Sequence, residues 1–120
     1  MKRITLLTLL SLSFLIFSCS NDSNFSLVGK KFVYAPRTVK DSNGNYLYWV
    51  KTFTSSSKVK QDVRIGSSSG DYFTPPTLST YKLSYPKLTI TEDDGSVFTY
   101  TFTSELSFKL DTNNTVFNQE

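Results

Sequence analysis

Few residues in this chain could carry out covalent or acid–base chemistry. The sequence holds no histidine, which excludes the usual Ser-His-Asp and Cys-His nucleophile systems and removes the commonest transition-metal ligand. Its only run of carboxylates, Glu92-Asp93-Asp94, precedes Gly95 in a predicted hairpin turn, where such groups are solvated. We therefore predict that the protein is not an enzyme.

Metal and cofactor sites are not predicted either. Asp41-Ser-Asn-Gly-Asn45 superficially resembles a calcium loop, but its glycine comes two positions early and the distal bidentate glutamate is missing. We expect a plain hairpin turn there. Gly66-Ser-Ser-Ser-Gly70 is flexible but lacks the Lys-Ser/Thr pair and the following helix of a phosphate-binding loop.

Cys19, the only cysteine, is the one residue with a predicted covalent role. A basic start and a short apolar stretch, Ile4–Phe17, precede it, as in a secretory signal peptide. Leu15-Ile16-Phe17-Ser18-Cys19 resembles the lipobox of bacterial lipoproteins. The resemblance implies that residues 1–18 are removed and that Cys19 becomes the lipidated N-terminus. An ordinary signal peptide with an incidental cysteine is the alternative.

Residues 19–27 are predicted to tether a domain of residues 28–120 to the membrane. The run Ser20–Ser26 is small and polar, without an apolar period. Ser20 differs from the acidic residue that retains some bacterial lipoproteins in the inner membrane, so we predict an outer-membrane location. Without a second cysteine, the domain must be held together by core packing, for which its aromatic residues suffice.

The domain is predicted to be all-β. Short runs with strand-like alternation are separated by turn signals such as Asn43-Gly44 and Asp94-Gly95, and no convincing helical period occurs. We expect Trp49 and Phe102 to point into the core. The predicted strands cover residues 31–35, 46–53, 59–65, 79–85, 87–91, 97–103, about 106–110 and about 116–117. An eight-stranded antiparallel up-and-down barrel follows, because closure removes exposed edges; a five-stranded barrel or a small β-sandwich is the alternative.

Two family resemblances add to this reading. Leu27-Val28-Gly29-Lys30-Lys31-Phe32 resembles the opening of lipocalin-like chains, in which a glycine shortly precedes an aromatic residue. The lipobox, the tether and a compact eight-stranded domain together resemble the potempins, surface lipoproteins that inhibit secreted peptidases. That resemblance implies a secreted peptidase, for example a serine peptidase, as the protein partner.

Charge is divided unevenly along the chain. Residues 30–64 hold eight basic and two acidic residues, whereas residues 65–120 hold three basic and seven acidic ones. Such a division can steer a protein partner. It is not the dense basic stripe of a nucleic-acid-binding protein, so no nucleic acid is predicted as a partner.

A partner-binding loop is predicted at residues 66–76. Tyr72 and Phe73 lie there between Gly70 and Pro75-Pro76, and a proline-braced loop loses little entropy when it binds. In the alternative, both rings fold back and close one end of the barrel. The predicted contact residues are Lys58, Lys60, Arg64, Tyr72 and Phe73.

The sequence thus favours a monomeric, membrane-anchored inhibitor of a secreted peptidase. The alternative is a lipocalin-like binder of a small apolar ligand. Eight short strands with many inward aromatic side chains predict a filled interior, which favours the inhibitor.

Substitution Cys19→Ala is expected to release the protein from membranes, because the acyl chains then have no attachment atom. Membrane fractionation after a salt wash measures this. A variant that still sediments with membranes would contradict the lipoprotein assignment.

Overall fold

A computed structural model describes residues 25–120 of the chain. The predicted signal peptide, Cys19 and most of the predicted tether lie outside these residues. The described part consists of eight strands joined by turns and loops. Within it no helix is long and apolar enough to cross a membrane. The strands are β1 (Lys31–Tyr34), β2 (Leu47–Phe53), β3 (Lys58–Ile65), β4 (Tyr72–Ser84), β5 (Lys87–Thr91), β6 (Val97–Ser104), β7 (Ser107–Leu110) and β8 (Val116–Gln119).

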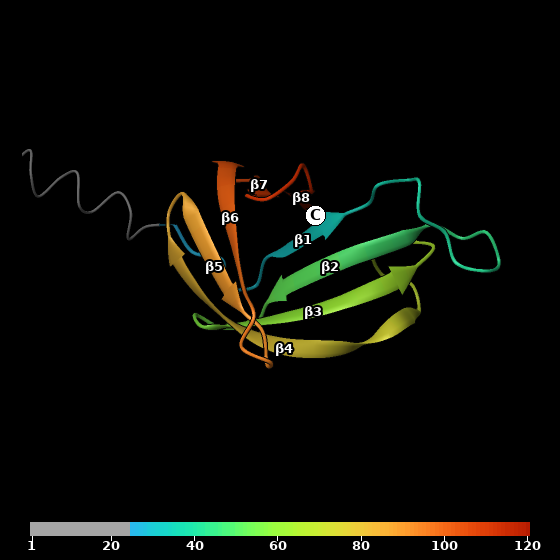
Figure 1. The fold of residues 1–120 in the computed structure, drawn as a ribbon, viewed down its shortest axis with the longest axis horizontal. Helices are drawn as coiled ribbons and strands as arrows, with labels where there is room; N and C mark the ends of the chain where they lie inside the picture. The colour runs from blue at the N-terminus through green and yellow to red at the C-terminus, as the bar shows by residue number, and fades with distance from the viewer. Residues whose placement is uncertain (1–24) are drawn as a thin grey trace, which may run out of the picture.

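The strands form a closed barrel in sequence order (Figure 1). Each pairs antiparallel with the next, and β8 closes the ring on β1 through the pairs Phe32↔Gln119 and Val33↔Asn118. The predicted eight-stranded antiparallel up-and-down barrel is therefore confirmed. The five-stranded barrel and the sandwich are excluded.

The predicted hairpin turns are also confirmed. Asp41 Oδ1 accepts hydrogen bonds from the backbone N–H groups of Asn43 (2.9 Å) and Asn45 (2.8 Å), and Gly44 has a φ of 85°. Gly95 turns the β5–β6 hairpin with a φ of 90°. Because the Asp41 carboxylate is engaged by its own turn, this segment is a plain connection between β1 and β2.

Aromatic rings fill one half of the barrel. Phe32, Phe53 and Phe108 are fully buried. The ring centroid of Phe108 lies 4.8 Å from that of Phe32 on β1 and 5.3 Å from that of Phe117 on β8. Phe102 is buried there, as predicted. This half is packed with side chains, as expected for a small barrel.

The segment before β1 packs against this filled end of the barrel. Leu27, predicted to end the tether, is 1% exposed and belongs to the core. The ring of Phe25 lies 4.8 Å from that of Tyr85 and 5.3 Å from that of Phe102. Phe25 and Leu27 therefore belong to the domain although they precede its predicted boundary at residue 28, because their apolar side chains pack against the barrel.

The other half of the barrel is open because β4 is much longer than its neighbour β5. Only Thr80–Ser84 of β4 pair with β5, so residues 72–79 have β3 on one side and, among the described residues, no ladder partner on the other. The prediction of a loop at residues 66–76 is therefore wrong for residues 72–76, which belong to β4. Successive N–H groups of a strand point to opposite sides, so only one of Pro75 and Pro76 faces the free side. The other is tolerated because the β3–β4 register shifts between the pairs Gln61↔Thr77 and Val63↔Thr74, which leaves both prolines without a ladder partner on β3.

The remaining loop, Gly66–Gly70, folds back over the outer face of β1 to β3. Ser68 is buried and hydrogen-bonds the carboxylate of Glu120, and Arg64 Nη1 donates to the Gly70 carbonyl (2.9 Å). A Cβ on Gly70 would sit 2.0 Å from the Ile65 carbonyl oxygen, so only glycine fits this turn.

This loop changes the environment of one predicted surface residue. The alternation in β3 predicts Asp62 on a solvated face, yet its side chain is fully buried and pairs with Arg64 Nε at 2.7 Å. Asp62 lies in register with Val50 and Val33 on the outer face, all three buried. The prediction of a solvated position for Asp62 is wrong, because the alternation of polar and apolar residues in a strand does not reveal that a loop covers the outer face.

Candidate functional site: the open mouth of the barrel

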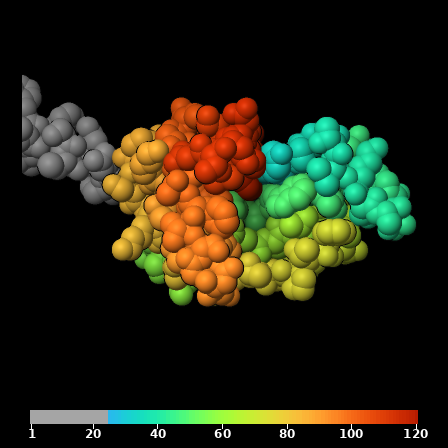
Figure 2. All heavy atoms as spheres, in the orientation of Figure 1, coloured from blue at the N-terminus to red at the C-terminus, as the bar shows by residue number. Residues whose placement is uncertain are grey.

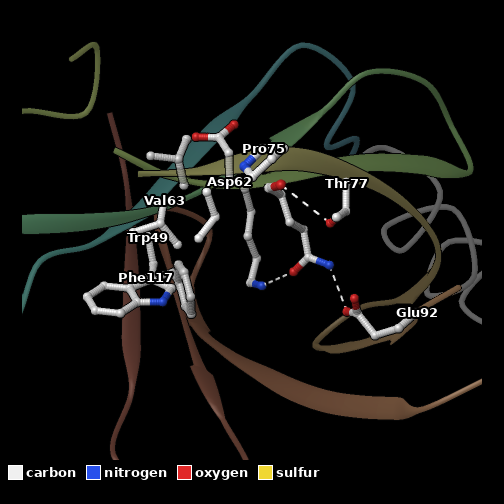
Figure 3. A pocket seen from close by; sticks show the side chains of 11 residues that line it. Trp49, Asp62, Val63, Pro75, Thr77, Glu92 and Phe117 are labelled. Atoms are coloured by element: carbon white, nitrogen blue, oxygen red, sulfur yellow. Dashed lines mark hydrogen bonds between the residues drawn. The ribbon is translucent and has the colours of Figure 1, made fainter. Parts of the chain in front are cut away.

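The open half of the barrel contains a pocket of about 410 Å³. It lies between β2, β3, the free part of β4 and the β5–β6 hairpin. Figure 2 shows the surface hollowed between this hairpin, in orange, and the green and yellow strands. Trp49, Val63, Pro75 and Phe117 form apolar walls, with Glu92 across the pocket from Trp49 and Phe117 (Figure 3).

Lys51 is the unexpected residue of this pocket. On β2 it stands between Trp49 and Phe53, two residues from each, so all three share the inward face. It pairs in register with inward-facing Phe32 on β1 and Gln61 on β3. The residue is only 7% exposed.

A chain of hydrogen bonds links Lys51 to Glu92. Lys51 Nζ donates to Gln61 Oε1, and Gln61 Nε2 donates to Glu92 Oε2 at 2.7 Å. Gln61 Nε2 also donates to Ser79 Oγ (3.0 Å), which donates to Glu92 Oε1 (3.3 Å). The Gln61 amide therefore bridges the ammonium and the carboxylate, and the two charges do not form a direct ion pair.

Burial strongly affects the charge of Lys51. Desolvation lowers the pKa of Lys51 to about 8, and the nearby Glu92 carboxylate offsets part of this shift. Burial likewise raises the pKa of Tyr100, on the same side of the core, to about 12, with the Glu92 charge adding to the shift. Lys51 Nζ lies 4.8 Å from the ring centroid of Phe117 and 5.3 Å from that of Tyr100. These ring faces stabilise the ammonium but accept no conventional hydrogen bond.

Among the described residues, not every N–H group of the Lys51 ammonium has a hydrogen-bond acceptor. It carries three N–H groups, and one is used by Gln61. Within residues 25–120, no carboxylate lies within 4.0 Å of Nζ. The mouth therefore combines apolar walls with one incompletely paired, buried cation.

The residues predicted to bind a partner lie on the outside of the barrel, not in this pocket. Lys58 is exposed and Lys60 half-buried on β3. The guanidinium of Arg64 lies 4.0 Å over the ring of Tyr72, so the structure brings these two together. Tyr72 and Phe73 begin β4 and are 46% and 50% exposed, so they neither project on a free loop nor close the barrel.

Sequence reasoning missed Lys51, Gln61 and Glu92. A usable signal was present for two of them. Lys51 interrupts the inward alternation of Trp49 and Phe53, and Glu92 continues the inward positions of Leu88 and Ile90. Glu92 was expected at a solvated hairpin tip, but it stands at the end of β5 and turns into the mouth.

Comparison of the chain with models of protein families, with curated proteins and with solved structures gives no match. In the part of the chain that the structure describes, no three His, Cys, Asp or Glu residues gather in a way that could hold a metal ion.

The buried Lys51 predicts an unusual pH dependence of stability. Below pH 8 Lys51 is protonated in both the folded and the unfolded state, and the folded state bears the full cost of desolvating the ammonium. Between pH 8 and the ordinary value of 10.5, only the unfolded state keeps the proton, so the free energy of unfolding should rise, by about 3 kcal/mol in total. Above pH 10 the raised pKa of Tyr100 acts in the opposite direction, since only the unfolded state then ionises.

Urea unfolding between pH 7.5 and 10 measures this effect. The rise should vanish in Lys51→Met and persist in Lys82→Met, which alters an exposed lysine on β4. Parallel pH profiles for the wild type and Lys51→Met would contradict the assignment.

Proposed function

We propose that this protein is a non-enzymatic binding protein whose barrel mouth takes one small, largely apolar ligand. The observation that carries the proposal is the apolar-walled pocket of about 410 Å³ at the open end. Such a volume is within the range of small-molecule sites, which combine apolar walls with a few polar groups.

The aromatic filling of the other half supports a small ligand. Phe32, Phe53 and Phe108 occupy the interior beyond the mouth, so a ligand is confined to the space lined by Trp49 and Phe117. A flat ring system suits these walls, because aromatic side chains favour offset or edge-on packing against other rings.

The proposed lipid anchor would orient the mouth away from the membrane. Phe25 follows Cys19 by only six positions, a distance of roughly 20 Å at most in an extended chain. Phe25 packs at the filled end, against Tyr85 near the end of β4, whereas the pocket lies along the start of β4. An outer-membrane protein held in this way would present its site to the surrounding medium.

Binding can be tested with N-phenyl-1-naphthylamine, a neutral apolar fluorophore. Its emission should rise saturably with one site per protein, and the emission of Trp49, the only tryptophan, should be quenched in parallel. Trp49→Ala should weaken binding roughly tenfold through lost ring contact.

Tyr48→Ala serves as the matched control, because Tyr48 is the neighbouring residue on the opposite face of β2. It should bind the probe as the wild type does. Absence of saturable binding, or equal losses in the two variants, would overturn the ligand-binding proposal.

A second candidate function is inhibition of a secreted peptidase, favoured by the free edge of β4. Residues 72–78 form an exposed, extended segment that has no ladder partner on one side among residues 25–120. Such an edge can pair with an extended segment of a partner protein, although Pro75 and Pro76 reduce the available donors. Lys58 and Lys60 lie on the adjoining strand, where their charge can steer an acidic partner.

Titration against peptidases secreted by the same organism tests this second candidate. Stoichiometric inhibition is expected, and the double substitution Tyr72→Ser and Phe73→Ser should weaken it at least tenfold through lost apolar contact. Val97→Ser, at an exposed apolar residue on β6, is the control and should have no effect.

Replacing Lys58 and Lys60 by methionine separates steering from direct contact. An effect confined to low salt indicates steering, and an equal effect at high salt indicates contact. If none of these peptidases forms a tight complex with the protein, inhibition is excluded.

A further inference from the structure

We infer that the ligand of the barrel mouth carries a single anionic oxygen group, such as a carboxylate or sulfonate, which binds Lys51 Nζ while its apolar body rests against Trp49 and Phe117. This inference rests on the proposed ligand-binding function and names the chemical class of that ligand.

The first support is the incomplete pairing of a buried charge. A buried ammonium is costly unless it is paired and hydrogen-bonded. Lys51 Nζ has one side-chain acceptor, Gln61 Oε1, and two aromatic ring faces. An anion from outside would supply the missing acceptors, and a charge-assisted hydrogen bond is strong where water is excluded.

The second support is that Glu92 is already engaged. Its Oε2 accepts from Gln61, and its Oε1 accepts from Ser79. Gln61 stands between Glu92 and the ammonium, so the carboxylate moderates the charge of Lys51 without pairing with it. Lys51 Nζ can donate to an incoming anion as well as to Gln61 Oε1, while Gln61 Nε2 keeps its hydrogen bond to Glu92.

The charges around the mouth select against ligands of higher charge. Glu92 faces Lys51 from the end of β5, and Asp93 and Asp94 lie at the exposed tip of the same hairpin. Among the described residues, Tyr100 on β6 is the other titratable group that packs against Lys51, and it is neutral below pH 10. Repulsion from the three carboxylates disfavours a second negative charge on the ligand.

The ammonium of Lys51 and the aromatic walls of the pocket lie close enough together for one small molecule to contact both. The ammonium is 4.8 Å from the ring centroid of Phe117, and Trp49 lies two residues away on the same face of β2. A flat apolar body with its anionic group at one edge would therefore contact the rings and the ammonium together.

A matched pair of probes tests the inference. 1-Anilinonaphthalene-8-sulfonate and N-phenyl-1-naphthylamine share one ring system and differ in the sulfonate. At pH 7 the wild type should bind the sulfonate at least about tenfold more tightly than the neutral probe. Lys51→Met should abolish this preference while retaining the neutral probe, and Lys82→Met should leave both affinities unchanged.

The wild-type protein provides an independent test that needs no folded variant. The preference for the sulfonate should fall as the pH rises from 7 to 9.5, because Lys51 loses its charge near pH 8. Sulfonate binding at pH 8.5 should take up a proton, detected by calorimetry in buffers of different ionisation enthalpy. Affinity for the neutral probe should stay constant.

The outcomes separate the two proposals. If neither probe binds saturably, the ligand-binding function fails. If both bind equally well, or if the preference is insensitive to Lys51→Met and to pH, the site exists but takes no anion through Lys51, and the present inference is overturned.

Discussion

The barrel depends on the packing of aromatic rings around Phe108. A chain with one cysteine has no intramolecular disulfide, and the β1–β8 ladder that closes the barrel contains two residue pairs. The rings of Phe32, Phe102 and Phe117, from β1, β6 and β8, pack around Phe108 at the place of closure. Buried aromatic area therefore holds together strands whose hydrogen bonds alone would form a weak seam.

The same packing determines where a site can exist. Rings occupy the half of the barrel where all eight strands are present. Beyond the end of β5, the first part of β4 has no ladder partner on that side among the described residues, and the pocket forms there. The mouth is thus a consequence of unequal strand lengths, and Trp49 is half-buried on its wall instead of belonging fully to the core as predicted.

Lys51 at this mouth is a cost to stability that an apolar residue would avoid. Its depressed pKa reports that the folded state disfavours the charge, and perturbed groups in pockets are often functional. Both proposed functions also involve β4. Pro75 contributes to the pocket wall, while the free edge of the same strand is the surface available to a protein partner.

By itself the sequence determined the strand number and order and the hairpin turns, whereas the lipidation of Cys19 stays a prediction. These features are local, because alternation and turn residues such as Asn43-Gly44 act within a few positions. Only the tertiary structure decided that Tyr72–Pro76 extend β4, that the Gly66–Gly70 loop buries Asp62, and that Glu92 turns toward Lys51. Each of these depends on which strands stand opposite one another and how far they reach. Local alternation indicates that Glu92 faces inward, but it does not indicate that Glu92 and Lys51 meet there.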